Sequence, residues 1–216
     1  MVHNLSSQNS ILNQYLGEIR DSEIQKDSMR FRRNLERMGE IFAYEISKTL
    51  SYTNFQTTTP LGIADTLQLR EQPVIATILR AGLPFHAGFL NVFDKAENCF
   101  VGAYRKQHKN NTFEIALEYY ASPDLNGKTL ILCDPMLASG SSIVKTYQAM
   151  LSKGTPAHTH LVCAIASREG IDHVKAHMPT SHFTIWCGAI DEELTAHAYI
   201  VPGLGDAGDL AFGEKL

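Results

Sequence analysis

The sequence predicts an α/β fold in which one mostly parallel, twisted sheet is flanked by helices. Apolar runs of strand length alternate along the chain with segments of helical periodicity, as in sheets built from βαβ units. The runs contain few polar residues, which is typical of strands buried on both faces of a parallel sheet. The expected strands are residues 74–79, 99–104, 130–133, 160–166 and 183–187.

The composition is that of one globular domain, residues 1–216, with 44% hydrophobic and 19% charged residues. The net charge of −4 gives no electrostatic reason to expect a nucleic acid partner. No apolar run approaches the roughly 20 residues of a membrane span, and the N-terminus lacks the pattern of a secretory signal. We therefore expect a cytoplasmic protein without a membrane partner. The four cysteines, far apart and each in an apolar run, are expected to be buried thiols.

The first 28 residues form a variable N-terminal segment, in which residues 1–21 are polar and weakly anchored and a long helix is predicted to begin at Ser22. A capping box, Ser22 with Gln25, predicts the start of the helix. The apolar anchors before it are Ile11, Leu12, Leu16 and Ile19. The apolar positions of the helix itself, stepping by four and three, are Phe31, Leu35, Met38, Phe42 and Ile46. We expect the segment before the helix to lie over the body or a neighbouring subunit.

Two stretches between the expected strands have different characters. Residues 57–70 predict a loop with little local order. Residues 106–122 are polar and then alternate through Phe113, Ile115 and Leu117, which predicts a hairpin arm. Such an arm suits a cover for the site or a contact with a partner subunit.

Residues 130–142, LILCDPMLASGSS, are the most informative stretch of the chain. Asp134 follows a buried strand at its carboxyl end, where open α/β sheets bind ligands. The small residues at 138–142 let the backbone approach an anion, and the periodicity of 143–151 predicts a helix that begins there. Free backbone N–H groups and the helix dipole would hold a phosphate.

Other motifs fit this stretch less well. No lysine follows Gly140, as a Walker A loop requires, and neither Ser139 nor Ser141 lies in a Gly-x-Ser-x-Gly elbow. A strand, a turn and a serine N-cap with no ligand remain an alternative.

Two arginines strengthen the phosphate hypothesis. Arg80 and Arg105 each directly follow an expected strand, so they should lie at the same sheet edge as Asp134. A guanidinium fork binds two phosphate oxygens at once, which lysine does less well. Either arginine alone could simply leave the core for water, but the two together beside a phosphate loop favour an anion site.

Two further groups are assigned no chemistry. Glutamates interleave with the arginine cluster of the long helix, which favours a solvated face or a subunit contact over an anion patch. The cluster consists of Arg30, Arg32, Arg33 and Arg37. His173 and His177 have the spacing of two metal ligands, but the glutamate of an H-E-x-x-H site is missing.

The C-terminal residues 203–208 fit the pattern G-x-G-x-x-G. A dinucleotide fingerprint opens a βαβ unit with an acid about 20 residues later, and neither follows here. The glycines instead predict a closely folded loop whose backbone touches a small planar ligand.

Over about residues 29–216 the chain closely resembles the uracil phosphoribosyltransferases, which have the type I phosphoribosyltransferase fold. The blocks that carry the resemblance are ILRAGL (78–83), AYR (103–105), DPMLASGSS (134–142) and YIVPGLGDAGD (199–209). The resemblance implies an enzyme that joins uracil to phosphoribosyl diphosphate (PRPP) with Mg²⁺, giving uridine monophosphate (UMP) and diphosphate in pyrimidine salvage. It also implies at least a homodimer, and it leaves open whether GTP activates the protein.

The resemblance also implies residue roles. Arg80 and Arg105 would bind the diphosphate, Asp134 the ribose hydroxyls, and Asp206 the donor with its magnesium, which PRPP carries; these four form the expected catalytic set. The expected PRPP site comprises Arg80, Arg105, Asp134, Pro135, Met136, Leu137, Ala138, Ser139, Gly140, Ser141, Ser142 and Asp206. The expected uracil contacts, within the C-terminal segment 188–216, are Ile200, Gly205, Asp206 and Ala207.

Two departures from the family pattern motivate a second hypothesis. Ser141 stands where the family usually has glycine, so this position must adopt a backbone angle that a side chain allows. The expected loop of Pro84, Phe85 and His86 lacks the acid common near Ala87. A regulator that senses uracil or a nucleotide on the same fold, with little catalysis, is therefore the alternative.

Overall fold

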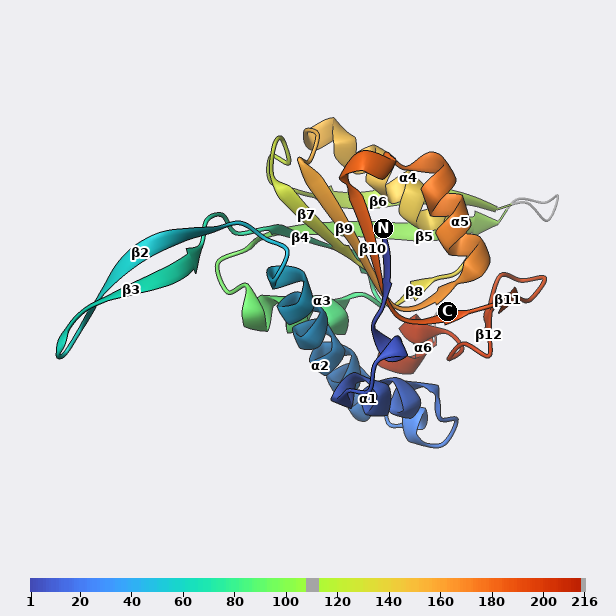
Figure 1. Ribbon diagram of the computed structural model, residues 1–216. Helices are drawn as coiled ribbons and strands as arrows, with labels where there is room; N and C mark the ends of the chain where they lie inside the picture. Colours follow the sequence, from blue (N-terminus) through green and yellow to red (C-terminus); the bar gives the residue numbers. More distant parts are fainter. Residues whose placement is uncertain (108–112, 215–216) are drawn as a thin grey trace.

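An eight-stranded sheet forms the centre of the molecule (Figure 1). The computed structural model describes residues 1–107 and 113–214, and the side chains of these except residues 103–118 and 180. Across the sheet the strands are β1 (Val2–Asn4), β10 (Phe183–Asp191), β9 (His158–Ser167), β7 (Thr129–Cys133), β4 (Val74–Leu79), β5 (Glu97–Gln107) and β6 (Phe113–Ala121), and β8 (Met136–Leu137) also pairs with β9. Neighbouring strands are parallel except β5 with β6. The predicted mostly parallel sheet is confirmed.

Helices cover both faces of this sheet (Figure 1). One face carries α1 (Ile11–Arg20), α2 (Ser28–Ser47), α3 (Leu83–Val92) and the short α6 (Ala207–Phe212), and the other carries α4 (Ser141–Met150) and α5 (Arg168–His177). Each face has its own hydrophobic core, one around Phe42 and Trp186 and the other around Tyr147 and Val174. Short 3₁₀ turns span Leu5–Ser7, Ile24–Lys26, Leu151–Lys153 and Thr180–His182. Among the described residues, no helix combines the length and the apolar character needed to cross a membrane.

The predicted apolar face of α2 is buried, but the helix begins later than predicted. Asp27, not Ser22, is its N-cap, because the Asp27 carboxylate accepts hydrogen bonds from the backbone N–H groups of Met29 and Arg30, at 3.0 Å each. The capping-box prediction was therefore wrong. Of the four expected anchors before the helix, Leu12, Leu16 and Ile19 are buried in the core of this chain and Ile11 is 53% exposed.

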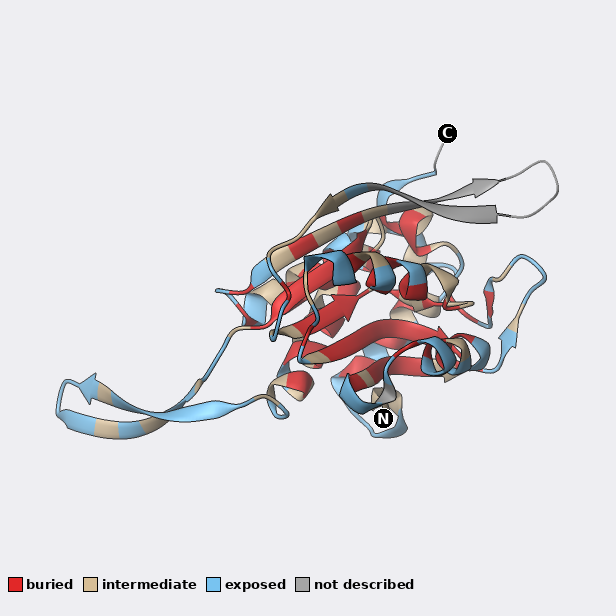
Figure 2. Ribbon diagram, turned by 90° about the horizontal axis from the view of Figure 1, so that it is seen from above, coloured by how far each residue is buried: buried red, intermediate tan, exposed pale blue. Residues whose placement is uncertain are grey.

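The prediction of a loop at residues 57–70 was also wrong. β2 (Tyr52–Thr59) and β3 (Gly62–Leu69) pair antiparallel as a two-stranded arm that extends away from the body (Figures 1 and 2). Both strands are mostly exposed, so the sequence lacks the apolar alternation that marks a half-buried strand. The antiparallel pair β5 and β6 agrees with the hairpin expected from 106–122, whose residues 108–112 lie outside the described part.

The expected loop of Pro84, Phe85 and His86 is the first turn of α3. Proline suits this position, since its missing N–H would have no partner in a first helical turn. Phe85 and His86 are buried in the core, 0% and 3% exposed. These residues therefore support the fold and do not form an unusual loop after Arg80.

Candidate functional site

The carboxyl ends of β4 and β7 meet at one edge of the sheet. Gly82 follows β4 and packs so closely that a Cβ there would lie 2.0 Å from Thr77 Oγ1 and 3.4 Å from the carbonyl oxygen of Cys133. Cys133 directly precedes Asp134, so the loop that carries Arg80 lies against the start of the loop that carries Asp134. The parallel register of β4 with β7, Thr77 opposite Cys133, produces this contact.

Asp134 is half-buried at the end of β7, and its backbone N–H donates to the carbonyl oxygen of Val162 at 3.0 Å. Loss of water around the carboxyl group raises its pKa to about 7, and the backbone N–H of Met136 acts in the opposite direction. A carboxyl group in this condition is stabilised as an anion by any ligand that donates hydrogen bonds to it. Ribose hydroxyl groups are such donors.

The loop after Asp134 ends in a sharp turn at the N-terminus of α4. Gly140 has φ of 77°, in the left-handed region, and Ser141 begins the helix with ordinary backbone angles. Ser141 therefore has a backbone angle that a side chain allows, as expected, because Gly140 makes the turn. No side chain in the described part of the chain caps α4, so its first N–H groups can face an anion.

Two residues of the next βα unit hold this loop from behind. The Ser167 hydroxyl donates to the carbonyl oxygen of Ala138 at 2.6 Å and accepts from the backbone N–H of Gly170 at 2.8 Å. A Cβ on Gly170 would lie 2.1 Å from the same carbonyl oxygen. The sequence predicted no role for Ser167 or Gly170, because a serine at the end of a strand with a glycine three residues later is also typical of an ordinary helix start.

The C-terminal segment folds at the same edge as an antiparallel ribbon and a short helix. β11 (Glu193–Leu194) pairs with β12 (Ile200–Val201), and the chain then turns through Gly203 and Gly205, with φ of 56° and 92°. Asp206 caps α6 by accepting from the backbone N–H groups of residues 208 and 209, at 2.8 and 3.0 Å. The expected closely folded loop is present, and α6 within it was not predicted.

The expected uracil contacts lie on this turn. Ile200 and Ala207 are buried at 4% exposure each, while Gly205 is exposed and a Cβ there would meet nothing within 4 Å. The segment is therefore anchored by apolar side chains on both sides of an open backbone turn. The side of Gly205 that a Cβ would occupy is open in the described structure.

Residues from distant parts of the chain fix this turn. Asp191, at the end of β10, accepts from the backbone N–H of Gly203 at 3.0 Å and is paired with Arg20 of α1. Arg20 also donates to the carbonyl oxygen of Gly203 at 3.0 Å. Neither residue was predicted, because Arg20 lies in the segment that the sequence left unassigned.

Arg80 contacts the C-terminal segment. Its guanidinium donates to the carbonyl oxygen of Gly213 at 3.1 Å and lies 3.6 Å from the carboxylate of Asp209, and both side chains remain more than a third exposed. Arg105 lies in β5 opposite Ile115, three residues beyond the pairing of Gly102 with Leu79 at the end of β4. Its side chain lies outside the described part.

The residues that were assigned no chemical role from the sequence have partners within the chain. The arginines of α2 bind within the chain: Arg30 pairs with Glu18, Arg33 with Glu36, Arg32 donates to the carbonyl oxygen of Ala211, and Arg37 donates to Asn34. His173 and His177 lie with their ring centroids 4.2 Å apart. All four cysteines are free and buried, as predicted.

Comparisons with known proteins agree with one another. A sequence model of the family described as "Uracil phosphoribosyltransferase" matches residues 6–214. A uracil phosphoribosyltransferase from Porphyromonas gingivalis is 54% identical over 215 residues, covering 100% of this chain and 99% of that protein. One from Methanothermobacter thermautotrophicus is 39% identical, covering 87% and 86%.

Solved structures agree on the fold. A protein from Aquifex aeolicus superposes with a TM-score of 0.86 at 29% identity, covering 99% of this chain and 98% of that one. A hypoxanthine phosphoribosyltransferase from Staphylococcus aureus superposes with a TM-score of 0.51 at 12% identity, covering 87% and 84%. The second likeness concerns the fold alone.

Proposed function

The chain belongs to the uracil phosphoribosyltransferase family, and we propose that its reaction, the transfer of the phosphoribosyl group from PRPP to uracil, takes place at the carboxyl edge of the sheet. The protein is a pentosyl-transferring enzyme, and its products are UMP and diphosphate. The placement of the reaction at this edge rests on the packing of Gly82 against Cys133, because this contact holds the loop of Arg80 against the loop of Asp134.

We assign the ribose 5-phosphate half of PRPP to the loop after β7. The N-terminus of α4, behind residues 138–142, supplies backbone N–H groups for the 5′-phosphate, with the hydroxyls of Ser139, Ser141 and Ser142 at hand. Asp134 accepts hydrogen bonds from the ribose hydroxyls, and these bonds replace the hydrogen bonds to water that burial removes from its carboxylate. Residues 135–137 link the two, and the pairing of β8 with β9 supports them.

Arg80 and Arg105 are assigned to the diphosphate. Breaking the ribose C1–O bond leaves positive charge on the sugar, while negative charge gathers on the departing diphosphate. Two guanidinium groups at this position stabilise that charge as it develops. The described contacts of Arg80 are with a partly exposed carboxylate and one carbonyl, which a diphosphate can replace.

The residues at this edge fit a magnesium ion that arrives with PRPP. Among the described residues there is no group of three His, Cys, Asp or Glu side chains arranged for a metal ion. Mg²⁺ keeps several waters and is usually bound through one or two carboxylates plus substrate phosphates. Asp206 would be the protein carboxylate, since its helix cap uses only Oδ1. The ion would supply charge neutralisation at the diphosphate.

Uracil is assigned to the turn between β12 and α6. Its edge presents O4, N3–H and O2, which require a donor, an acceptor and a donor from the protein. Backbone groups from Ile200 and residues 205–207 can supply them on a turn that Gly203 and Gly205 shape. Cytosine changes this pattern and would leave groups unpaired, at a cost of about 1 to 3 kcal/mol each.

No protein nucleophile is assigned. The uracil N1 atom attacks the ribose carbon directly as the C1–O bond to diphosphate breaks, and the N1 proton is released to solvent or to the departing diphosphate. Positioning and charge stabilisation therefore supply most of the rate. The alternative, a sensor with little catalysis, loses support because Ser141 has ordinary backbone angles and because residues 84–86 form the first turn of α3.

We further propose that the chain is one catalytic domain that acts in the cytoplasm as a homodimer or higher oligomer. Four free, buried cysteines suit a reducing compartment. The exposed β2–β3 arm suits a contact with a second copy, because a two-stranded ribbon is marginally stable alone in water. GTP is proposed as an activator, to be measured in the same assay.

The test is conversion of radiolabelled uracil to UMP by the full-length protein with PRPP and magnesium, with and without GTP. We expect UMP in a stoichiometric ratio to diphosphate. Binding of uracil or PRPP without any UMP would support the sensor and contradict the enzyme. Cytosine in place of uracil is the specificity control.

A further inference from the structure

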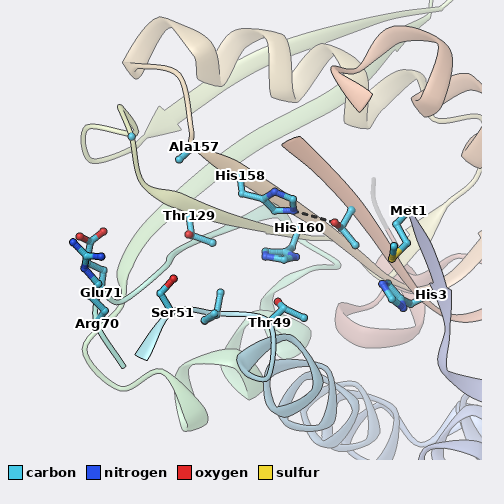
Figure 3. A pocket seen from close by; sticks show the side chains of 13 residues that line it. Met1, His3, Thr49, Ser51, Arg70, Glu71, Thr129, Ala157, His158 and His160 are labelled. Carbon is cyan, nitrogen blue, oxygen red and sulfur yellow. Dashed lines mark hydrogen bonds between the residues drawn. The ribbon is translucent and has the colours of Figure 1, made fainter. Parts of the chain in front are cut away.

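A hollow of about 540 Å³ lies at the amino edge of the sheet, opposite the proposed active site (Figure 3). It is bounded by the first residues of β7, β9 and β10, by the segment between α2 and β2, and by the residues after β3. The side chains that the argument uses are Ser51, Arg70, Thr129, His158 and His160. No residue assigned to the transfer reaction lines this hollow.

The course of the chain explains why the sheet is uncovered here. α2 ends at Ser47, and the chain then leaves the body to form the β2–β3 arm. His158, His160 and Val162 lie on one face of β9, because every second side chain of a strand points the same way. Val162 lies in the core that α2 helps to form. The two histidines therefore lie on the same face of the sheet as that core, beyond the end of the helix.

His160 presents one N–H group to this hollow. The indole N–H of Trp186 donates to His160 Nδ1 at 3.1 Å, so the proton of the neutral ring is on Nε2. The side chain is 96% buried in protein, since only 4% is exposed, and among the described residues Nε2 has no hydrogen-bond partner. Burial lowers the pKa of His160 to about 3, and the neighbouring His158 and His3 contribute. The ring is therefore a neutral donor.

Other groups around the hollow favour an electron-rich ligand. Among the described residues, the hydroxyls of Ser51 and Thr129 have no hydrogen-bond partner, and the guanidinium of Arg70 at the rim has no ion pair. His158 bonds to Thr184 at 2.9 Å, and its pKa is lowered by burial and by repulsion from His182 and the amino terminus. Glu71 is the only carboxylate among the lining residues. The hydroxyls of Ser51 and Thr129 can donate to an oxyanion, and Arg70 supplies a positive side chain at the rim.

We propose that this hollow binds a small organic molecule through an oxyanion group, either a carboxylate or a phosphate. The oxyanion accepts from His160 Nε2–H and from the hydroxyl of Thr129, and Arg70 supplies the opposite charge. The volume of the hollow is far larger than the roughly 30 Å³ that one water molecule occupies in the liquid, so the hollow also has room for the rest of the organic ligand.

The experiment is a titration of full-length protein, with its histidines labelled with ¹⁵N, followed by NMR of the ring nitrogens. Inorganic phosphate and acetate are the two probes, and sodium chloride at matched ionic strength is the control. The His160 signal is assigned by its loss in the variant His160→Gln. If that variant folds poorly, the signal is assigned by the change of its chemical shift in Thr129→Val. We expect saturable shifts at His158 and His160.

Two variants decide whether the site is the hollow. Arg70→Gln should weaken binding about tenfold, equivalent to about 1.4 kcal/mol, whereas Arg33→Gln, an exposed arginine of α2, should leave it unchanged. Saturation by phosphate alone, by acetate alone or by both identifies the oxyanion. Shifts that do not saturate, that chloride reproduces, or that persist unchanged in Arg70→Gln overturn the proposal.

Discussion

The guanidinium of Arg20 and the carboxylate of Asp191 form a two-pronged ion pair, with both N–O distances at 2.8 Å. Asp191 is 8% exposed and Arg20 is 21% exposed, so water screens this pair little. Together they bind both the N–H and the carbonyl of Gly203, which begins the proposed uracil turn. A helix near the N-terminus thereby fixes the backbone of a turn near the C-terminus.

Asp191→Asn should therefore impair the use of uracil selectively. The amide keeps the size of the carboxylate but removes its charge, so the pair with Arg20 weakens and Gly203 loses its fixed position. We expect the KM for uracil to rise about tenfold or more, since a charged hydrogen bond contributes about 1.5 to 3 kcal/mol, while the KM for PRPP stays near that of the unaltered protein. Steady-state kinetics with each substrate varied in turn is the measurement.

The neighbouring residue offers a matched control. Glu192 also pairs with an arginine, Arg168, but these side chains are 69% and 51% exposed. Glu192→Gln should change neither KM, because exposed ion pairs contribute little. Equal increases of both KM values in Asp191→Asn would indicate a general loss of structure and contradict the positioning role.

Ser167 and Gly170 lead to a prediction for the phosphate loop. Ser167→Ala removes the hydrogen bonds to Ala138 and Gly170, and Gly170→Ala places a methyl group against the carbonyl of Ala138. Both should raise the KM for PRPP, by about tenfold in Ser167→Ala on the basis of about 1 to 2 kcal/mol and by more in Gly170→Ala. Ser152→Ala, on an exposed turn, is the control. An unchanged KM in Gly170→Ala would show that this loop does not hold the 5′-phosphate.

The sequence-based prediction and the structure agree best for segments whose side chains are buried. The strand 74–79 was predicted to the residue, because every position from Val74 to Thr77 is buried and apolar side chains dominate. The arm at 52–69 was missed for the opposite reason: its strands bury little, so no apolar alternation marks them. Contacts between distant segments, such as Arg20 with Asp191, leave no local pattern in the sequence.

The candidate site divides in the same way. Asp134 and Arg80 could be placed at one edge because each follows a buried strand, and parallel strands end together. The resemblance to a family was needed for the uracil turn. Gly140, rather than Ser141, takes the left-handed angle, and only the backbone itself could show which residue of the pair makes the turn.

Asp134→Asn should increase stability above neutral pH while it decreases turnover. The folded protein holds the pKa of Asp134 at about 7, above the ordinary value of 3.8, so between these pH values the folded state binds more protons than the unfolded state. Stability from this group is thus complete below about pH 4 and is lost as the pH rises toward 7. At about 1.4 kcal/mol per pKa unit the loss is at most about 4 kcal/mol, and partial solvent screening reduces it.

The measurement is denaturant unfolding of both proteins, without ligands, at pH 5 and pH 8. The free energy of unfolding of Asp134→Asn should exceed that of the unaltered protein at pH 8 and approach it at pH 5, and UMP formation should fall strongly. Full activity of this variant would refute the role with the ribose hydroxyls. Asp124→Asn, at an exposed carboxylate, is the control for changes in net charge.

The β2–β3 arm predicts a contact between copies of the chain. Register places Tyr52, Ile63 and Leu67 on one face of the arm, at 45%, 71% and 67% exposure. The double variant Ile63→Ser, Leu67→Ser should shift the oligomer toward monomer in analytical ultracentrifugation, because apolar contacts stabilise such interfaces. Thr57→Ser, on the other face, should not. A double variant that assembles as before would leave the arm outside the interface.

Arg80 yields the last prediction, because the C-terminal segment competes for it. Asp209 lies 3.6 Å from the guanidinium, where the leaving diphosphate is proposed to bind. Removing the carboxylate by Asp209→Asn should lower the KM for PRPP modestly, by about two- to fivefold, since exposed pairs are worth about 0.2 to 1 kcal/mol. Removing the guanidinium by Arg80→Gln should raise the KM by tenfold or more, from about 1.5 to 3 kcal/mol for a charged hydrogen bond. The double variant discriminates: if Asp209 acts only by competing for Arg80, the charge of residue 209 has no effect once Arg80 is gone. An improvement that persists in the Arg80→Gln background would mean that Asp209 repels the diphosphate directly, and Arg80 would then not be the group they share.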